Sequence, residues 1–538
     1  MKAHHWMLAA LCGLALLLRL TLMPMLNNPG IHDSQHYYNL GARLVAGHGF
    51  SIDYVWHFNT LHDSIEHPTD HWMPLTGVLT AAGMLLFGVT PHGAMLPFVL
   101  LGSLLPLLSY MATRQLGLSP RYGLLAAAML VAVPEIIWQS TRPLTTVPQM
   151  WLVGGALLAL MHALKTGRLW VYLLSGACLG LAYLNRNDAI LLIPAIVLTL
   201  IGVALWGKGA YRLRWGGLLL TGIVAVAVVT PWLVRNVQEL GQIGASATTR
   251  MMLMSTYNEL YLYVEPGEPD PISLETWLQR QTIQDVIAKR LFEFAAALKQ
   301  MTIFIAPGLP LLVAGGGVLA LVRRERGIWP GVLPVISLLL VTVVVYPFLL
   351  PYQNQGGSFR TAYLSLVPLL VPLAAYGLKV AIPAARLQAG LVALLVIYSA
   401  ALAWDNIRLD VAIADRFHAV MQDVTATAQA LPDITGDGEV RLLSQDPFVL
   451  RYYGIRSAAV PYGTPDDAIK AARRYEIDYI LMPTSWNTVD VFYGASADLN
   501  DAPVDPRFTF AAQVPRGPGQ LPYELYAIEP SADASAAR

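Results

Sequence analysis

The chain has 538 residues, of which 55% are hydrophobic and only 13% are charged, and its mean hydropathy is +0.50. A single soluble core cannot account for this balance, so we expect a polytopic membrane protein. Lysine plus arginine equals aspartate plus glutamate at 35 each, which argues against nucleic acid as a partner. The two cysteines, Cys12 and Cys178, fall in apolar segments and predict neither a disulfide framework nor a metal cage.

An apolar segment at 7–26 lies near the start of the chain. It is too long for the hydrophobic region of a cleaved signal peptide and has no clear small-x-small cleavage site, so we interpret it as a retained first span. Ten more segments are long and apolar enough to cross a bilayer about 30 Å thick. They are 93–113, 122–137, 146–164, 169–184, 189–206, 215–234, 301–322, 328–350, 361–379 and 387–404. The sequence therefore predicts an all-α polytopic membrane bundle of about 11 transmembrane helices.

Residues 74–89 form a twelfth apolar candidate, and whether they cross the bilayer decides the side of every later loop. If they lie in the outer interface, the short basic loops all face the cytoplasm, as the positive-inside rule requires. These loops carry Arg114, Arg121, Lys165, Arg168, Lys208, Arg212, Arg214, Arg323, Arg324, Arg326, Lys379 and Arg386. On this topology the N-terminus is inside, and the outward segments are 27–73, 138–145, 185–188, 235–300, 351–360 and everything after Trp404.

The short outward loops are poor in basic residues, yet four outward segments place an arginine at or near a helix end: Arg142, Arg186, Arg235 and Arg360. A single arginine at a helix end can simply anchor to lipid headgroups, and that alternative stays open for each of the four. Four beside a carboxylate-rich loop indicate anion binding, because a guanidinium is a forked donor suited to phosphate. Arg19, inside the first span, is expected to snorkel or to pair with a neighbouring helix.

The non-membrane segments predict a domain division. Residues 1–404 are expected to form the membrane domain, with outer loops 27–92 and 235–300. In the first loop a helix is expected over 33–44. In the second loop a helix is expected from residue 274, lying on the bilayer surface or packed against the bundle. Residues 405–530 have soluble composition and predict a small periplasmic α/β domain, followed by a disordered tail at 531–538. The expected strands of this domain are 440–443, 479–482 and 523–528. Its expected helices are 447–453 and 465–475.

The first outer loop holds the densest run of acids and imidazoles in the chain. Its members are His32, Asp33, His36, His62, Asp63, Glu66, His67, Asp70 and His71. Titratable groups this dense beside a membrane bundle indicate a reaction site more often than a solvated loop. They also permit a divalent metal, held by His62, Asp63, Glu66 and His67, although no spacing is a recognised metal signature. The sequence therefore predicts no required cofactor, with a divalent metal as the open alternative.

Motifs in this order resemble those of the GT-C superfamily of polytopic glycosyltransferases, in particular the group of dolichyl-phosphate-mannose protein mannosyltransferases and bacterial lipid A aminoarabinose transferases. The motifs are Asp33 with Tyr37, Tyr38 and Gly-His-Gly-Phe at 47–50, His-Trp-Met-Pro-Leu at 71–75, Gly-Leu-Ala-Tyr-Leu-Asn-Arg at 180–186, Pro-Trp-Leu-Val-Arg-Asn at 231–236, and more weakly Arg-Thr-Ala-Tyr at 360–363. The resemblance reaches from the N-terminus to about residue 378. It departs at 71–74, where family members often have a lysine before a double proline.

The resemblance implies an inverting transfer of a sugar from a polyprenyl-phosphate donor to a hydroxyl on the outer face. Asp33 would be the catalytic base; its alternative role is the N-cap of the following helix, and both can hold at once. Four residues would bind the donor phosphate: Arg186, Arg235, Arg360 and His71. Four more would bind substrate: His32, Tyr37, Asp70 and Arg142.

The acceptor is expected to be a glycan, a lipid or a protein, and membrane lipids surround the bundle. The chain has no Asn-x-Ser/Thr sequon, which favours a bacterial inner membrane, with the active site and C-terminal domain on the periplasmic side. Two other classes remain as alternatives. A transporter or lipid flippase would line a midplane path with charges, and a non-catalytic scaffold would use the membrane part only as an anchor.

Overall fold

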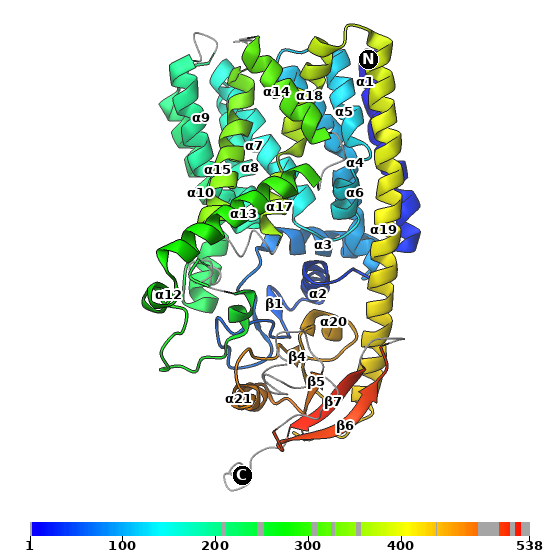
Figure 1. Ribbon diagram of the computed structural model, residues 1–538, viewed down its shortest axis with the longest axis vertical. Helices are drawn as coiled ribbons and strands as arrows, with labels where there is room; N and C mark the ends of the chain where they lie inside the picture. The colour runs from blue at the N-terminus through cyan, green and yellow to red at the C-terminus, as the bar shows by residue number, and fades with distance from the viewer. Residues whose placement is uncertain are drawn as a thin grey trace. The chain divides into compact units, whose positions relative to one another are not determined.

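The computed structural model describes residues 3–206, 211–244, 252–254, 256–303, 309–323, 329–350, 357–436, 438–482, 505–516 and 522–528 (Figure 1). The chain forms two compact units. Unit 1 comprises Met1–Pro29, Trp72–Ala245 and Ile283–Asp410, and unit 2 comprises Gly30–His71, Ser246–Thr282 and Val411–Arg538. Both units are therefore discontinuous in sequence. The boundaries expected at 404/405 and 530/531 stay predictions, and the tail at 531–538 lies outside the described residues.

Unit 1 is helical. Its elements are α1 (Ala3–Leu22), η1 (Met23–Met25), α3 (Pro74–Phe87), α4 (Pro91–Gln115), α5 (Pro120–Leu130), α6 (Pro134–Ser140), α7 (Thr146–Thr166), α8 (Leu169–Asn185), η2 (Asn187–Leu191), α9 (Leu192–Trp206), α10 (Trp215–Leu240), α13 (Ile283–Ile303), α14 (Leu309–Val322), α15 (Trp329–Leu349), α17 (Ser358–Leu364), α18 (Val367–Ala381) and the first part of α19 (Ala385–Gln429). Four of these helices begin with proline, which lacks the N–H that a first helical position leaves unbonded and has a fixed φ suited to it.

The described helices confirm the predicted fold class. Seven are long and apolar enough to cross a membrane, or nine if two bent pairs each count as one span. The bent pairs are α5 with α6, at 68°, and α17 with α18, at 52°. The remaining two predicted spans coincide with the shorter apolar helices α8 and α14, so each of the eleven predicted segments contains helix.

α3 is the segment on which the predicted topology depends. It has 14 residues, which give a length of about 21 Å, short of a hydrocarbon core about 30 Å thick. Figure 1 shows it lying across the direction of the long helices at one end of unit 1. It ends at Gly88, whose φ of +90° only glycine adopts readily. These features support the predicted interfacial placement.

Arg19 stabilises the break between α5 and α6. Its side chain is fully buried, and Nε donates to the Ser140 hydroxyl at 2.8 Å. Nη1 donates to the carbonyls of Ala15, at 2.9 Å, and of Val131, at 3.4 Å. The Val131 carbonyl belongs to the bend before Pro134, where the helical hydrogen bonds are interrupted. Arg19 therefore pairs with a neighbouring helix, and the snorkelling alternative is wrong.

Unit 2 is an α/β structure. Its elements are α2 (Asp33–Val45), β1 (Ser51–Ile52), β2 (His67–Pro68), η3 (Tyr257–Tyr261), α12 (Leu274–Arg280), the end of α19, β3 (Leu442–Leu443), α20 (Pro447–Tyr452), β4 (Ser457–Ala458), α21 (Pro465–Tyr475), β5 (Tyr479–Met482), β6 (Phe508–Val514) and β7 (Tyr523–Ile528). The five-stranded sheet has the order β4-β3-β5-β7-β6, with β4, β3 and β5 parallel and β7 antiparallel to β5 and β6. The predicted strands and helices of this region are confirmed, while β4 and β6 were not expected.

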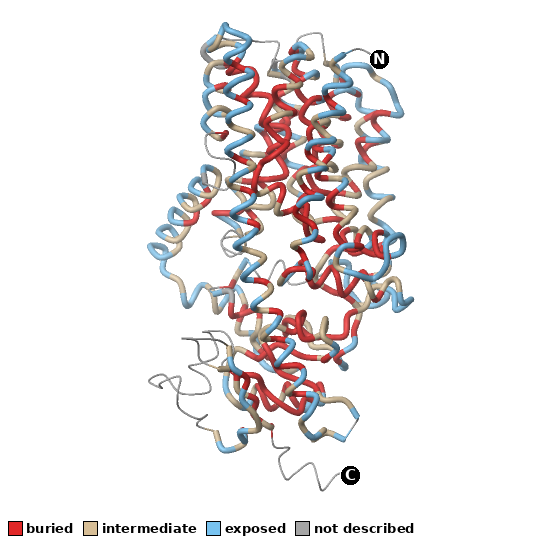
Figure 2. Tube along the Cα trace, turned by 90° about the vertical axis from the view of Figure 1, so that its right-hand side faces the viewer, coloured by how far each residue is buried: buried red, intermediate tan, exposed pale blue. Residues whose placement is uncertain are grey.

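The first outer loop shares a core with this sheet. Val55 pairs in parallel with Ala458, and the Val55 amide donates to the Ser457 carbonyl at 3.0 Å. Phe58 and Ile65 belong to the same buried apolar cluster, whose other members include Ala458, Ile469, Tyr475 and Ile480. Buried residues mark the interior of each unit in Figure 2. The loop is thus built into unit 2 as a structural part.

The helix predicted from residue 274 is two helices. α12 begins with a capping box between Ser273 and Thr276 and ends before Gln281, whose backbone is extended at φ −113° and ψ 128°. The prediction of one continuous helix is wrong because this residue leaves the helical region. α13 follows, and it exposes the apolar side chains Ile283, Ile287, Leu291 and Phe292, which is consistent with the first of the two predicted locations, on the bilayer surface.

Candidate functional site

Asp33 is the first residue of α2 in unit 2, and its side chain is exposed. The N-cap is His32, whose φ of +56° is uncommon for a residue with a Cβ. The His32 carbonyl accepts the amides of Gln35 and His36. The alternative in which Asp33 caps the helix is therefore wrong. At the first helical position a carboxylate is instead stabilised by the helix dipole and points away from the packed face.

The opposite face of α2 is fixed by buried contacts within unit 2. His36 Nδ1 lies 2.6 Å from the Tyr54 hydroxyl, and Asn39 Nδ2 donates to the Phe448 carbonyl at 3.0 Å. Tyr37 is only 2% exposed and contacts the His36 ring edge-on at 5.1 Å. α2 is therefore a rigid support for Asp33. Tyr37, a predicted substrate residue, lies in the packing of this support.

Burial of His36 gives unit 2 a pH-dependent stability. Burial lowers its pKa well below the ordinary 6.5, His71 lowers it further, and Asp70 opposes them. Below about pH 6.5 the unfolded chain therefore binds a proton that the folded chain does not, and stability falls by at most about 1.4 kcal/mol per pH unit for this group. We expect the thermal unfolding midpoint to fall from about pH 7.5 to about pH 5, and to fall less steeply in His36→Gln. An unchanged slope in that variant, or the same reduction in the exposed control His48→Gln, would contradict this assignment.

Two of the predicted metal-binding carboxylates are engaged in ion pairs. Glu66 bonds to Arg43, which also contacts the buried Asp53 through Nη1 at 2.9 Å. Asp53 receives a second guanidinium, Arg451 Nε, at 2.7 Å. The exposed Asp63 pairs with Arg474 Nη2 at 3.0 Å. The sequence did not predict this network. Asp53 follows β1, and its partners Arg43 and Arg451 belong to α2 and α20, the second of which is distant in the sequence.

A cluster of imidazoles surrounds Asp70, which is 1% exposed. His62 Nε2 lies 3.1 Å from Asp70 Oδ2, and His57 Nε2 lies 3.4 Å from Oδ1. Burial alone would raise the pKa of Asp70, but His57 and His62 hold it well below its usual range. The ring of His67 stacks on His62 at 3.8 Å. The structure thus brings together three predicted residues, His62, His67 and Asp70, and adds His57.

His71 is the fourth imidazole in this region, after His57, His62 and His67. Burial lowers its pKa to about 3, with a further contribution from His57, so the ring is neutral at physiological pH. The ring packs edge-on against Trp56, with 4.6 Å between the ring centroids, and its centroid lies 5.7 Å from that of the His57 ring. As a predicted phosphate ligand His71 can therefore offer a neutral N–H donor, but no positive charge.

In unit 1, Arg186 forms a two-pronged ion pair. Its Nε donates to Asp188 Oδ1 at 3.0 Å and its Nη2 to Oδ2 at 2.6 Å. Nη1 reaches the Thr145 hydroxyl at 3.1 Å, and the Tyr346 hydroxyl donates to Asp188. The guanidinium is therefore held in one plane between α8 and the loop before α7.

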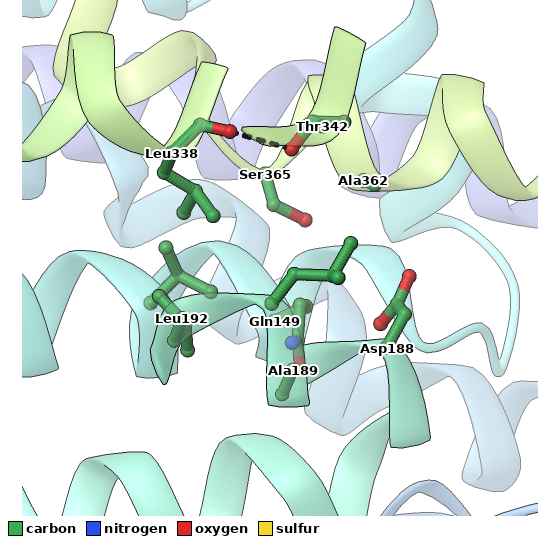
Figure 3. Close-up of a pocket in the computed structure, with 10 residues that line it drawn as sticks. Gln149, Asp188, Ala189, Leu192, Leu338, Thr342, Ala362 and Ser365 are labelled. Atoms are coloured by element: carbon green, nitrogen blue, oxygen red, sulfur yellow. Dashed lines mark hydrogen bonds between the residues drawn. The ribbon is translucent and has the colours of Figure 1, made fainter. Parts of the chain in front are cut away.

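A pocket of unit 1 lies beside this ion pair (Figure 3). Four polar side chains line it, Gln149, Asp188, Thr342 and Ser365, among apolar ones. The Thr342 hydroxyl donates to the Leu338 carbonyl at 2.7 Å, as the dashed line shows. The pocket has room for about one water molecule, so it does not by itself indicate a ligand site.

Two further arginines meet on one indole. The guanidinium carbons of Arg142 and Arg360 lie 5.5 and 5.7 Å from the Trp138 ring of α6. Each is also paired with a carboxylate, Arg142 with Asp410 and Arg360 with Glu135. The fourth arginine, Arg235, lies over Trp232 at 4.8 Å and donates to Asn236 at 3.1 Å. The structure thus brings Arg142 and Arg360 together, and Arg186 contacts Thr145, three positions after Arg142.

The sequence did not reveal the carboxylate partners of these arginines. Glu135 and Arg360 are separated by 225 positions, and Arg142 and Asp410 by 268. No local spacing predicts such pairs. The anchoring alternative, in which each arginine reaches lipid headgroups alone, does not describe Arg142, Arg186 or Arg360. Asp33, His32, Asp70 and His71 belong to unit 2 and the arginines to unit 1, so a single site formed by both sets stays a prediction.

Three comparisons relate the chain to known proteins. Residues 66–234 match the family described as dolichyl-phosphate-mannose-protein mannosyltransferase. The chain is 29% identical over 217 residues to the undecaprenyl phosphate-alpha-4-amino-4-deoxy-L-arabinose arabinosyl transferase of Pseudomonas aeruginosa, a match that covers 38% of this chain and 37% of that protein. The chain therefore spans little more than a third of the length of this curated relative.

Solved structures share the fold at low identity. A structure of the Archaeoglobus fulgidus oligosaccharyltransferase, tethered with an acceptor peptide, aligns with a TM-score of 0.53 and 12% identity, covering 89% of this chain and 69% of that chain. A second structure of the same protein aligns with a TM-score of 0.52 and 13% identity, covering 88% and 67%. The chain therefore shares its fold with this oligosaccharyltransferase, although the two sequences are only 12–13% identical.

Proposed function

We propose that this chain is a membrane glycosyltransferase of the GT-C superfamily and transfers a sugar from a polyprenyl-phosphate donor to a hydroxyl acceptor with inversion. The observation that carries the proposal is the guanidinium cluster of unit 1. Arg142 and Arg186 lie within the matched segment 66–234, and Arg360 joins Arg142 on Trp138. Fixed guanidiniums at helix ends suit a lipid-linked phosphate, which is anionic and anchored in the membrane.

The proposed chemistry divides between a base and a set of cations. The Asp33 carboxylate takes the proton of the acceptor hydroxyl while its oxygen attacks the anomeric carbon. The bond from that carbon to the donor phosphate breaks on the opposite face, and negative charge develops on the leaving phosphate. Arg186, Arg360 and Arg235 are proposed to stabilise this charge, because fixed donors at a developing anion lower the barrier most.

The ion pairs suggest how these cations act. Asp188 holds Arg186 in place and Glu135 holds Arg360, so neither side chain has to be ordered when the phosphate arrives. The phosphate would share each guanidinium with its carboxylate. Arg142, bound to Asp410 and close to the Trp138 ring, is proposed to contact the substrate.

The remaining predicted substrate residues divide by exposure. His32 is exposed beside Asp33 and is proposed to contact the acceptor. Tyr37 and Asp70, at 2% and 1% exposed, are proposed to position α2 and the imidazole cluster. His71 is proposed to donate a neutral N–H to the donor phosphate. The acceptor class, whether glycan, lipid or protein, is set by contacts that these residues alone do not define.

The test is transfer by purified full-length protein in lipid nanodiscs. A panel of undecaprenyl-phosphate sugars is offered with membrane, glycan and protein acceptors, and the release of free undecaprenyl phosphate is followed with the product. We expect release to depend on one donor sugar and on an acceptor, with an inverted anomeric centre in the product. Retention of configuration would contradict the proposed chemistry. If the intact lipid-linked sugar moves from one leaflet of a vesicle membrane to the other and no sugar is transferred to an acceptor, the protein is a flippase instead.

The chain is an integral membrane protein, and we propose that unit 2 faces the periplasm of a bacterial inner membrane. In a background with Cys12→Ser and Cys178→Ser, a single cysteine at position 48 (His48→Cys) is expected to react rapidly with an impermeant thiol reagent in intact cells. A single cysteine at position 323 (Arg323→Cys) is expected to react only after permeabilisation. Rapid labelling at position 323 in intact cells would overturn the interfacial placement of α3.

A further inference from the structure

Three side chains of unit 2 present ligand atoms to one another around Asp70. One nitrogen each from His62 and His67 and one carboxylate oxygen of Asp70 lie within 4.8 Å of one another. None of the three is the proposed base or one of the proposed phosphate-binding arginines. His62 is partly buried, whereas His67 and Asp70 are at least nine-tenths buried.

His67 shows that this arrangement has an unused acceptor. Its Nδ1 lies 3.0 Å from the Pro68 carbonyl, and because a carbonyl can only accept, Nδ1 carries the proton. The neutral ring then has its lone pair on Nε2. That atom is buried, in a side chain that is 5% exposed, and has no hydrogen-bond partner within the described residues. A buried acceptor that is left without a partner is unfavourable, so the arrangement calls for an occupant.

The geometry of His67 is also typical of a metal ligand. Ligating histidines usually donate the N–H of their other ring nitrogen to a backbone carbonyl or carboxylate, which fixes the tautomer and the ring orientation. The bond to Pro68, a residue of β2, does this for His67.

A second residue orients the carboxylate. The backbone N–H of Asn59 donates to His57 Nδ1 at 3.2 Å, so the N–H of the His57 ring is on Nε2. This Nε2 faces Asp70 Oδ1 at 3.4 Å. Asp70 is thus held on one oxygen by His57, while Oδ2 is directed to His62. The nearby carboxylates Asp63 and Glu66 are engaged by Arg474 and Arg43, which leaves Asp70 as the carboxylate of the cluster.

We infer that His62, His67 and Asp70 bind a divalent ion of the zinc class, with these three protein ligands and a remaining position for water or an anion. Two imidazoles and one carboxylate suit zinc and its neighbours in the first transition row, whereas magnesium and calcium prefer oxygen ligands throughout. The site does not include Asp33, and it does not depend on the proposed transfer reaction.

Binding requires a defined local change. A metal lies in the plane of each imidazole at about 2.0–2.1 Å, whereas the rings of His62 and His67 stack with an angle of 7° between their planes. The two rings must therefore rotate apart as the ligand atoms close around the ion. His62 would bind through Nε2, the atom that faces Asp70 Oδ2, with the N–H on its other ring nitrogen.

The test is direct titration of the full-length protein. The protein, stripped by chelation and held in nanodiscs, is titrated with zinc chloride by calorimetry, and separately with cobalt chloride, whose visible spectrum reports the coordination. We expect one zinc site and no competition from magnesium. Asp70→Asn and His67→Ala are each expected to weaken zinc binding by at least about 100-fold, and His57→Gln by about 10- to 100-fold with the stoichiometry kept.

Matched controls separate this site from surface histidines. His48→Ala removes an exposed imidazole of the same loop and is expected to leave zinc affinity unchanged. Binding that persists in Asp70→Asn and His67→Ala but disappears with the His4 and His5 pair at the N-terminus would overturn the inference, as would the absence of a zinc site in the wild-type chain. Thermal unfolding of each variant checks that it is folded. Because the readout is binding, a failed transfer assay does not affect the result.

Discussion

Asp33→Asn is expected to lower the rate of sugar transfer by about 10²–10⁴-fold, because an amide cannot accept the acceptor proton. The substitution should leave the fold intact. Asp33 is exposed, the N-cap of α2 is His32, and asparagine has nearly the same shape as aspartate. The change in the helix-dipole interaction is about 0.3–1 kcal/mol at most. The measurement is single-turnover transfer in nanodiscs, with thermal unfolding of the same samples.

The matched control is Asp423→Asn. Asp423 is an exposed aspartate of α19 in the same unit, and it has no proposed part in the reaction. We expect this variant to transfer at the wild-type rate. Turnover near wild type in Asp33→Asn would refute the assignment of the base, and an equal loss in both variants would attribute the effect to unit 2 as a whole.

The second large effect is on stability and concerns Asp478, which is fully buried in unit 2. Its Oδ1 accepts the amides of Ile434 and Thr435, each at 2.8 Å, and its Oδ2 accepts the amide of Arg441 at 2.9 Å. Asp478→Ala leaves these three donors without their acceptor. Since an unsatisfied buried donor costs about 1–3 kcal/mol, we expect a total loss of about 3–5 kcal/mol.

The loss is read as a lower unfolding midpoint of the full-length chain in denaturant or on heating. Asp63→Ala is the control, because that fully exposed side chain contributes only a surface ion pair to Arg474, and such pairs add little to stability. Asp478→Asn, which keeps one acceptor oxygen, is expected to fall between the two. A midpoint for Asp478→Ala within the range of the control would show that the loop 434–441 is held by other contacts.

The sequence predicted those features that depend on local pattern. Hydropathy located the eleven apolar segments, and helical spacing located α2 and α21 to within a residue of their observed ends. It missed β4 and the β1–β2 pair because each strand has only two residues, which is too short to show alternation. It missed the discontinuity of both units because that depends on contacts between distant parts of the chain.

The candidate site divides in the same way. The four arginines and the acid–imidazole loop could be found as residue types at expected helix ends. Their partners Glu135, Asp188 and Asp410 could not be singled out, since the packing of helices decides which carboxylate meets which guanidinium. His57 was likewise missed, because its importance comes from the Asn59 amide and Asp70 on either side of its ring.

The pairing of Val55 with Ala458 has a consequence for biosynthesis. About 400 residues separate Val55 from Ala458, and a ribosome adding about 5–20 residues per second needs about 20–80 seconds to make that length of chain. During that interval the helix that carries Asp33 lacks the apolar partners it will finally have. A nascent or prematurely terminated chain is therefore expected to lack a completed unit 2, so the proposed sugar transfer could begin only when translation is nearly finished.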